Sequence, residues 1–423
     1  MIFNILNINN KNMKSQLLEC YRAGLERVRG EGVTRRWLDG FPGAAPVRLV
    51  AIGKAAEAML DGAVAALGGR LAAALSITRH GYSGSEHCAD VRIECRESGH
   101  PLPDAASLAA GARLLSFIAE APARQQWVFL ISGGTSSLVE VPAAGVSLQD
   151  LVALNDWLLG SGLDIAAMNR VRASVSRIKG GRLAAHLHGR GVACGLISDV
   201  PDDDPASIGS GLLVPPSDGD MGLEDIALPE ALRARLPAAP PAMAGKGDFA
   251  GIDCRILARL DDALAAVVET ARGQGLPVHR HPERLRGEAA DTGRRLAREL
   301  CAGPPGLHVW GGETRVRLPA SPGRGGRSQH LALAAAIELA GHSDCLLLAA
   351  GTDGSDGPTD AAGALVDAWT VERGEIEGLD AQAALTAADA GSFLEASGDL
   401  IVTGPTGTNV MDLVIGWKGA VSG

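Results

Sequence analysis

The sequence predicts an α/β protein whose larger part is a doubly wound parallel sheet. Short apolar runs alternate with segments of helical periodicity along the chain. Glycine supplies 55 of the 423 residues, roughly twice its usual share. Aromatic residues supply only 3%, so the core must be packed with aliphatic side chains. This composition suits tight strand-to-helix turns and is unlike a surface that stacks single-stranded nucleic acid.

The first half of the chain contains the pattern of a parallel sheet. Apolar runs predict strands over 47–52, 71–77, 127–131 and 192–197. Between them, helical spacing predicts helices over 14–29, from residue 55 to about 67, and over 105–120, the last with Asp104 as its N-cap. A Rossmann-like, doubly wound N-terminal domain is therefore expected over 13–245. Residues 1–12 hold five of the eight asparagines and predict a leader outside the fold, with Met13 as the natural start.

A second, smaller α/β domain is expected over 250–420. Residues 215–250, rich in Pro, Ala, Asp and Gly, predict a short helical excursion and a linker. The second unit is expected to begin near Ile252. Its expected elements are a helix over 260–273, a strand over 307–310, a hairpin into 314–318, a helix over 328–339, and strands over 346–350, 400–402 and 413–417.

Charge and cysteine usage exclude several classes of protein. The net charge of −10 argues against a general binder of polyanions, so no nucleic-acid partner is expected. No window of 18 consecutive apolar residues occurs, so no membrane span is expected. The seven cysteines are scattered and form no CxxC pair, which argues against zinc ribbons and disulfide frameworks. A reducing, cytoplasmic location fits this pattern.

Two glycine loops follow predicted strands of the first domain. Gly53 and Lys54 follow 47–52, and an ammonium at a helix start attracts an anion. An ordinary surface lysine is an equal alternative, and a Walker A loop is excluded because no Ser or Thr follows the lysine. The second loop carries hydroxyls and N–H groups that can donate to carboxylate or phosphate, and is favoured over a plain turn. Its candidate ligand residues are Ser132, Gly133, Gly134, Thr135 and Ser136.

Charged residues of the same domain add further candidates. The basic segment 169–184 contains Lys179 within a Lys-Gly-Gly sequence, with a solvated helix face as the alternative. Asp199 follows the strand over 192–197, at the strand end where α/β folds place functional groups. Together with the carboxylates of 202–204 it can hold Mg²⁺. An acidic surface turn is the alternative for 202–204, which stay undecided.

The second domain carries an arginine loop and two polar glycine loops. Gly325 and Gly326 precede Arg327 at a helix start, where a guanidinium offers paired donors to phosphate or carboxylate. A mobile loop is the alternative. The segments 350–360, with Asp353, and 403–409, with Thr406 and Asn409, each follow a strand, and either alone is compatible with a turn. Basic anion sites, glycine loops and carboxylates are together the parts that phosphoryl transfer needs.

Several motifs in one order resemble a known family. They are AIGKAA (51–56), SGHPLPD (98–104), ISGGTSSL (131–138), IKGGRLA (178–184), ISDVPDDDP (197–205), GGET (311–314), GRGGR (323–327), AAGTDGSDGPTDAAGA (349–364) and TGPTGTNVMDL (403–413). With them, residues 14 to 418 resemble the glycerate 2-kinase family, whose C-terminal half is the MOFRL domain. Each motif is weak alone, and their shared order is specific.

The resemblance implies phosphorylation of D-glycerate by ATP at the 2-hydroxyl, with Mg²⁺, in a cleft between the two domains. It implies that Lys54 and Arg327 are the catalytic cations. The glycine loops, Lys179, Asp353, Thr406 and Asn409 are our own candidates for binding substrate or phosphate. The position of Asp199 suggests Mg²⁺ ligation or acceptance of the hydroxyl proton. A homodimer is left open.

The chain departs from the family pattern after the arginine loop. The family reads Asn-Gln-Glu where this chain reads Ser328-Gln329-His330, and Ser328 is expected to cap the helix. The alternative activity is an NAD(P)H-dependent hydroxypyruvate reductase, a label that some relatives carry. No GxGxxG occurs, and the one GxGxxA, at 245–250, lies in the linker rather than after a strand. A binding module without catalysis is a third and weaker hypothesis.

Overall fold

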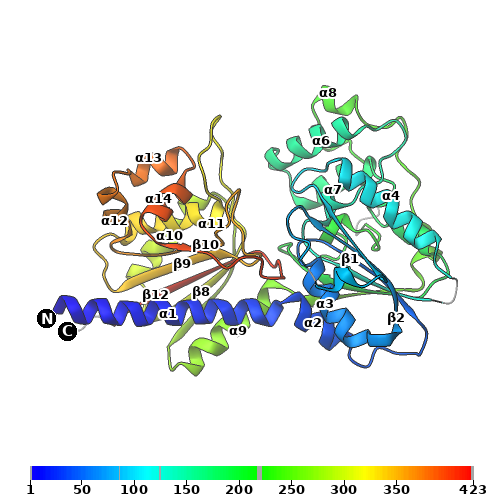
Figure 1. Cartoon of the computed structure of the whole chain (residues 1–423). Coiled ribbons are helices and arrows are strands. Elements are labelled where there is room, and N and C mark those ends of the chain that lie inside the picture. Colours follow the sequence, from blue (N-terminus) through cyan, green and yellow to red (C-terminus); the bar gives the residue numbers. More distant parts are fainter. Residues whose placement is uncertain (1, 85, 123–124, 217–221, 421–423) are drawn as a thin grey trace. The chain divides into compact units, whose positions relative to one another are not determined.

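The computed structural model describes residues 2–84, 86–122, 125–216 and 222–420, with side chains from residue 11 onward. The chain forms two compact units, each built on its own six-stranded sheet (Figure 1). The N-terminal unit comprises residues 29–259 with 407–409, and the C-terminal unit comprises 1–28, 260–406 and 410–423. Within the described residues no helix is both long and apolar enough to cross a membrane.

The sheet of the N-terminal unit is wholly parallel, with strand order β3-β2-β1-β4-β5-β6. Its strands are β1 (Val47–Ile52), β2 (Leu71–Arg79), β3 (Ile93–Ser98), β4 (Gln126–Ile131), β5 (Val192–Ile197) and β6 (Ile252–Ala258). The chain first winds outward from β1 to β3 and then restarts beside β1 with β4. This is the Rossmann-like, doubly wound order that the sequence predicts, and its switch point lies between β1 and β4.

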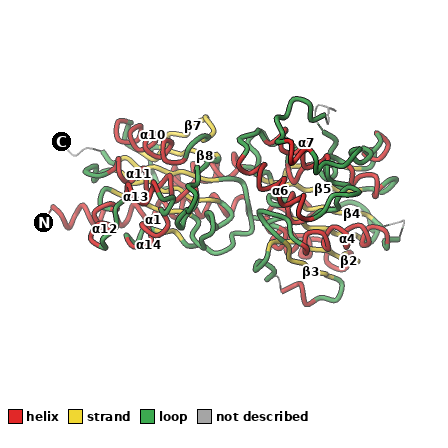
Figure 2. Tube along the Cα trace, turned by 90° about the horizontal axis from the view of Figure 1, so that it is seen from above, coloured by secondary structure: helices red, strands yellow, loops and turns green. Residues whose placement is uncertain are grey.

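Helices cover both faces of this sheet, which is why its central strands are almost continuously apolar. The helices are α2 (Gly30–Leu38), α3 (Ala56–Leu67), α4 (Ala105–Ala119), α5 (Thr135–Leu138), α6 (Leu148–Gly160), α7 (Ile165–Ser174) and α8 (Glu230–Arg233). Asp104 caps α4 as predicted, since its carboxylate accepts from the Ser107 N–H at 2.9 Å. Figure 2 shows α4, α6 and α7 over the strands. Phe117 of α4 meets Trp127 edge to face, and Trp127 stacks on Phe129, in the core of this unit.

The C-terminal unit has a mixed sheet with strand order β11-β10-β9-β12-β8-β7, in which β7 and β8 are parallel and the other pairs are antiparallel. Its strands are β7 (Val278–Leu285), β8 (Gly306–Gly312), β9 (Cys345–Gly351), β10 (Gly363–Asp367), β11 (Leu400–Ile401) and β12 (Asp412–Lys418). Its helices are α1 (Ile2–Val28), α9 (Leu260–Gly273), α10 (Ala289–Ala302), α11 (Arg327–Leu339), α12 (Thr370–Ile376), α13 (Ala381–Thr386) and α14 (Ala390–Ala396). Helices α1 and α9 lie on one face of the sheet, and α10 to α14 lie on the other (Figure 1).

Two predicted segments differ from the structure. Strand β6, expected near Ile252 to open the second unit, instead pairs in parallel with β5 and completes the first sheet. Residues 2–12 are helical and continue α1, and their assignment as a leader stays a prediction. The hairpin expected into 314–318 is wrong, because these described residues are irregular and bridge at Arg315 to Glu288.

The structure contains a disulfide between Cys88 and Cys95, a pair that the sequence pattern, which argued against a disulfide framework, did not predict. Cys88 lies in the short helix η2 (Glu86–Ala89) and Cys95 lies on β3, which returns along the edge of the sheet. The chain reversal between them places the two Cα atoms 5.8 Å apart. Sequence spacing alone gave no CxxC signal for this pair.

Candidate active site

The loops after β1 and β4 are bonded to each other at the switch point of the first sheet. The Lys54 N–H donates to the Gly133 carbonyl at 2.9 Å, and the Ala55 N–H donates to Ser132 Oγ at 3.1 Å. Thr135 Oγ1 donates to the carbonyls of Ile52 and Ser132 at 3.0 and 2.8 Å. These buried hydroxyls therefore form the framework of the two loops. This geometry fixes the backbone of Lys54 between the carboxyl end of β1 and the start of α3.

Two glycines allow the close packing of these loops. At Gly53, with a φ of +129°, a Cβ would lie 2.1 Å from Ser132 Oγ. At Gly133, a Cβ would lie 2.1 Å from Asp199 Oδ2 and 2.2 Å from Asn409 Nδ2. Any side chain at these positions would push the loops apart, because real Cβ atoms do not approach other atoms so closely. The absence of a side chain at Gly133 thus lets Asp199 and Asn409 lie directly against the backbone of this loop.

Asp199 and Asn409 meet against the Gly133 backbone. Asn409 Nδ2 donates to Asp199 Oδ2 at 3.3 Å, although 210 positions separate the two residues in the chain. Asp199 follows β5, as predicted, and Asn409 belongs to the short segment 407–409 that packs with the N-terminal unit. The Gly30 N–H fixes this segment by donating to the Gly407 carbonyl at 2.8 Å. Gly133, Asp199 and Asn409, three of the predicted site residues, are therefore in one place.

A second cation, Arg172, lies near Asp199 and was not singled out by the sequence. Its Nε donates to Asn155 Oδ1 at 3.1 Å, and its Nη1 lies 3.3 Å from Asn169 Oδ1. Burial lowers the pKa of Arg172 to about 10, against the charges of Asp199 and Glu140, and the group stays a cation at neutral pH. The Asn-Arg-Val-Arg sequence was the available signal, but it did not show which of its two half-buried arginines lies near Asp199.

Polar side chains extend the same network around the second loop. Ser136 Oγ lies 2.6 Å from Ser210 Oγ, which donates to Asn169 Oδ1 at 2.9 Å. On the other side, the His100 Nδ1 lies 2.9 Å from Ser137 Oγ. A Cβ at Gly134 would lie 3.3 Å from both the His100 ring and the Lys54 side chain. His100 therefore joins the candidate site, although the sequence offered it only as part of a longer motif.

Lys179, predicted as a ligand for phosphate, is instead in the protein core. Its side chain is 1% exposed and forms an ion pair with the equally buried Glu140, which also accepts from Ser176 Oγ at 2.5 Å. Burial lowers the pKa of Lys179, and the Glu140 carboxylate opposes that effect. Because Glu140 holds its ammonium in the interior, we leave Lys179 out of the ligand-binding groups.

Two of the three carboxylates of 202–204 have roles within the fold. Asp204 accepts from the Ala206 N–H and from Ser207 Oγ, and so holds a turn. Asp203, with a positive φ of 52°, lies 3.7 Å from Arg259. Asp199 faces the second glycine loop, since a Cβ at Gly133 would lie 2.1 Å from its Oδ2. One carboxylate with phosphate oxygens and water is a usual donor set for Mg²⁺, so the residues fit that ion.

In the C-terminal unit, Arg327 is clamped between two carboxylates. It begins α11 as predicted, and its Nε and Nη2 donate to the Asp412 carboxylate at 2.6 and 3.0 Å. Its Nη1 donates to Glu313. Burial acts to lower the pKa of Arg327, but these carboxylates outweigh it and raise the pKa well above its usual value. The paired donors predicted for an anion are therefore used within the unit, and they fix the direction of the guanidinium.

The start of α11 is occupied by Asp356 rather than capped by Ser328. The Asp356 carboxylate accepts from the N–H groups of Ser328 and Gln329 at 3.1 and 2.7 Å. A Cβ at Gly326 would lie 2.3 Å from the Asp356 carboxyl carbon, so the glycine admits it. Burial, together with Asp412, raises the pKa of Asp356 to about 7, against the two N–H donors. Burial also lowers the pKa of His330 to about 4, so this residue is neutral.

The two polar glycine loops of this unit bind one another. Thr406 Oγ1 donates to the Thr352 carbonyl at 2.5 Å, and Thr352 Oγ1 donates to the Met411 carbonyl at 2.6 Å. Asp353 Oδ1 accepts from the Ser355 N–H at 3.0 Å and so shapes its own loop. At Gly325 a Cβ would lie 2.9 Å from the Gly391 nitrogen, so this glycine permits a close backbone approach.

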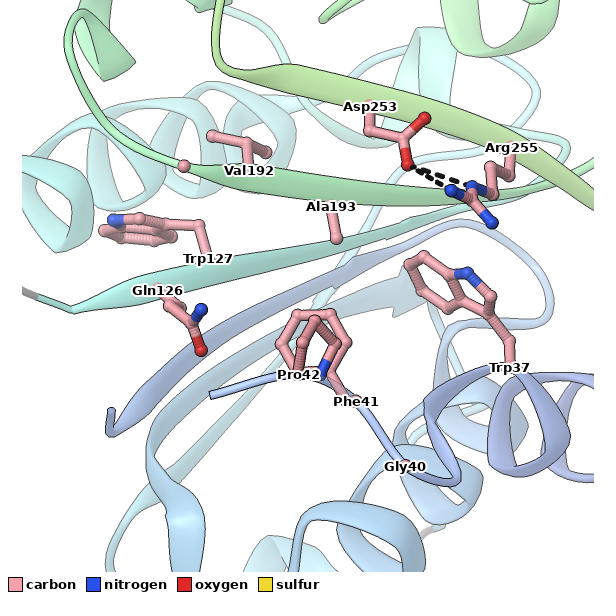
Figure 3. Close-up of a pocket in the computed structure, with 11 residues that line it drawn as sticks. Trp37, Gly40, Phe41, Pro42, Gln126, Trp127, Val192, Ala193, Asp253 and Arg255 are labelled. Atoms are coloured by element: carbon pink, nitrogen blue, oxygen red, sulfur yellow. Dashed lines mark hydrogen bonds and ion pairs between the residues drawn. The ribbon is translucent and has the colours of Figure 1, made fainter. Parts of the chain in front are cut away.

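A pocket of about 320 Å³ lies at the amino ends of strands β4 and β5 of the first sheet (Figure 3). Trp37, Phe41 and Trp127 line it, and the Asp253–Arg255 ion pair lies at its side (Figure 3). It adjoins the first residues of β4 and β5, whereas the candidate site follows their last residues. Ligands of doubly wound sheets bind beyond the carboxyl ends of the strands, so this pocket is separate from the candidate site.

The fold and the site define a doubly wound α/β protein with a lysine and two glycine loops at its switch point, and a second α/β unit. Residues 16–239 match a domain of unknown function (DUF4147), and residues 306–412 match the MOFRL family. A D-glycerate 2-kinase of Thermotoga maritima is 35% identical over 385 residues, which cover 88% of this chain and 90% of that protein. A relative from Agrobacterium vitis, provisionally named as a hydroxypyruvate reductase, is 38% identical over 80% of this chain and 90% of its own.

A solved structure agrees with these relatives. The crystal structure of glycerate kinase from Thermotoga maritima matches with a TM-score of 0.80 and 34% identity, covering 96% of this chain and all of that one. The chain therefore belongs to the glycerate 2-kinase family with a MOFRL domain. The resemblance found in its motifs is confirmed.

Proposed function

We propose that this protein phosphorylates D-glycerate with ATP at the 2-hydroxyl, giving 2-phosphoglycerate and ADP. The observation that carries the proposal is the bonded pair of loops at the switch point, where Lys54 begins α3 beside Gly133, Asp199 and Asn409. A helix start with a lysine and glycine-lined backbone is suited to anionic groups, and both substrates are anions. The names of the relatives supply the reaction.

In the proposed reaction, the oxygen of the 2-hydroxyl forms a bond to the γ-phosphorus while the bond from that phosphorus to the β–γ bridging oxygen breaks. Lys54 neutralises the transferred group or binds the glycerate carboxylate, and Arg327, whose direction Asp412 and Glu313 fix, is proposed for the same role when substrate displaces one of these carboxylates. Asp199, oriented by Asn409 and facing the charge of Arg172, either accepts the hydroxyl proton or holds Mg²⁺. When bound, Mg²⁺ neutralises charge on the phosphates. The active site between the two domains stays a prediction, as do a homodimer and a cytoplasmic location.

The hydroxypyruvate reductase alternative has less support. A dinucleotide-binding turn after β1 needs the glycines of GxGxxG, whereas this turn reads Gly53-Lys54-Ala55-Ala56. A side chain on the residues after Gly53 leaves less room for a pyrophosphate against the backbone.

An assay of both activities tests the proposal. Release of ADP is measured with ATP, Mg²⁺ and D-glycerate, and oxidation of NADH is measured with hydroxypyruvate. We expect ADP release that depends on D-glycerate, with a phosphorus NMR signal of 2-phosphoglycerate. A mixture without D-glycerate controls for ATP hydrolysis. NADH oxidation without ADP release would favour the reductase, and a 3-phosphoglycerate signal would refute the proposed position.

A further inference from the structure

Three potential metal ligands converge beside the first turn of α3, and none of them is assigned to the proposed reaction. Glu57, Cys88 and Cys95 each present one ligand atom, and these atoms all lie within 4.8 Å of one another. They come from α3, η2 and β3 respectively. No other group of His, Cys, Asp or Glu in the described parts of the chain is as compact. All three side chains are half-buried, so the group is accessible to an ion and partly shielded from water.

The carboxylate of this group is held in place by a buried hydroxyl. Ser76 Oγ, on β2, donates to Glu57 Oε1 at 2.7 Å, which directs Glu57 Oε2 to within 3.7 Å of Cys88 Sγ. Ser76 pairs with Cys95 across β2 and β3, so the same register positions the second sulfur. Ligands in metal sites are commonly oriented by such hydrogen bonds from a second shell of groups.

We propose that Glu57, Cys88 and Cys95 form a zinc site when the two cysteines are reduced. Two thiolates and a carboxylate suit Zn²⁺, whereas Mg²⁺ does not favour sulfur. With Zn–S and Zn–O bonds of about 2.3 and 2.1 Å, tetrahedral ligand atoms lie roughly 3.6 Å apart. The separation of 3.7 Å between Glu57 Oε2 and Cys88 Sγ agrees with that value. Water completes the coordination.

The site exists in two chemical states that exclude each other. In the oxidised state the Cys88–Cys95 disulfide occupies both sulfurs. Two equivalents of a small thiol break that bond, giving two protein thiols and one small-molecule disulfide. Zn²⁺ then binds the two sulfurs with release of two protons. A small-molecule disulfide reverses the sequence by oxidising the thiolates and releasing the ion.

A second cysteine pair in the molecule offers a matched control. Cys301 Sγ and Cys345 Sγ lie 3.5 Å apart, and Cys345 Sγ lies 3.7 Å from Asp344 Oδ1. Here Lys418 Nζ lies 2.6 Å from the Asp344 carboxylate. Its ammonium repels a cation and holds the carboxylate, so this pair is not expected to bind zinc.

The test is the zinc content of the full chain in its two states. After reduction with a phosphine, incubation with Zn²⁺ and desalting, we expect about one zinc per chain, and after oxidation close to none. This comparison needs no mutation. We further expect that the Cys88→Ser/Cys95→Ser variant binds no zinc, that Glu57→Gln lowers zinc affinity by about tenfold or more, and that Cys301→Ser keeps the wild-type content.

Cobalt substitution supplies an independent measurement. Reduced wild type with Co²⁺ is expected to show thiolate charge-transfer bands and the visible bands of tetrahedral cobalt, which vanish on oxidation. Reduced wild type without bound zinc would overturn the proposal. So would equal zinc in the Cys88→Ser/Cys95→Ser variant, an unchanged affinity in Glu57→Gln, or loss of zinc in Cys301→Ser.

Discussion

The starts of helices α3 and α11 look alike in sequence and differ in structure. In each, a cation directly follows a glycine. Lys54 follows Gly53 just before α3, and Arg327 follows Gly326 as the first residue of α11. At α3, the Ala55 N–H donates to the neutral hydroxyl of Ser132. At α11, the N–H groups donate to the buried carboxylate of Asp356, and two further carboxylates hold the arginine. The first helix start is suited to an incoming anion, whereas the N–H groups of the second are already bonded to Asp356.

The surroundings of the two cations therefore depend to different degrees on the cation itself. The backbone and hydroxyl framework around Lys54 is independent of the lysine side chain, so the loop should survive its removal. The framework around Arg327 includes the guanidinium, because the Asp412 side chain is 8% exposed and its ion pair with Arg327 compensates its burial. Substitutions at the two cations should therefore have different costs.

Arg327→Ala is expected to have the largest effect, because it removes a catalytic cation and leaves buried Asp412 without its partner. We expect kcat to fall by about a hundredfold or more, and the melting temperature to fall by several degrees. Activity assays and thermal unfolding measure the two effects. Arg324→Ala is the control, since Arg324 pairs with Glu395 where both side chains are 58% exposed. A stable Arg327→Ala protein would contradict the proposed clamp.

Lys54→Ala is expected to lower kcat by about a hundredfold while the melting temperature changes little. The physical reason is that the bonds between the two loops come from the backbone and from Ser132 and Thr135. The same assays measure both quantities. Lys246→Ala is the control, because the exposed Lys246 also follows a glycine, Gly245; it should change neither kcat nor the melting temperature. Wild-type turnover in Lys54→Ala would remove this lysine from the mechanism.

Lys179→Met separates a buried lysine from one that binds substrate. Removing one partner of the buried pair leaves Glu140 unpaired, so we expect the free energy of unfolding to fall by about 3 kcal/mol. KM for ATP and D-glycerate should stay near wild type in the folded fraction. Denaturant unfolding and steady-state kinetics measure the two effects, and the double variant with Glu140→Leu should recover much of the stability. A raised KM without loss of stability would restore Lys179 as a ligand.

The local elements of the fold were largely predictable from the sequence. The strands over 47–52 and 192–197 and the helix over 260–273 have the expected bounds, because apolar runs and helical spacing are local signals. Strand β7 (Val278–Leu285) was missed because it is an edge strand with charged residues and Pro282. The side to which β6 pairs depends on the register with β5, which no local pattern contains.

The partners of the site residues were much less predictable. The strand-end rule predicted Asp199, and a glycine loop predicted Asn409, but their meeting depends on how segment 407–409 packs. Lys179 looked like a loop cation because its partner Glu140 lies 39 positions earlier in the chain. Local motifs therefore give the candidates, and long-range packing decides which of them face a ligand. The assignments of these side chains to substrate stay predictions.

Asp356→Asn tests the carboxylate at α11 through the pH dependence of stability. Burial raises the pKa of Asp356 to about 7, above its value of about 4 in the unfolded chain. Between these values the unfolded state loses the proton and the folded state keeps it, so wild-type stability falls as pH rises. The asparagine cannot titrate, and other groups are common to both proteins. The free energy of unfolding of the wild type, relative to that of the variant, should therefore fall from pH 4 to 7 and level off above pH 7. Denaturant unfolding across this range measures it, and a constant difference would show that burial does not hold the proton on Asp356.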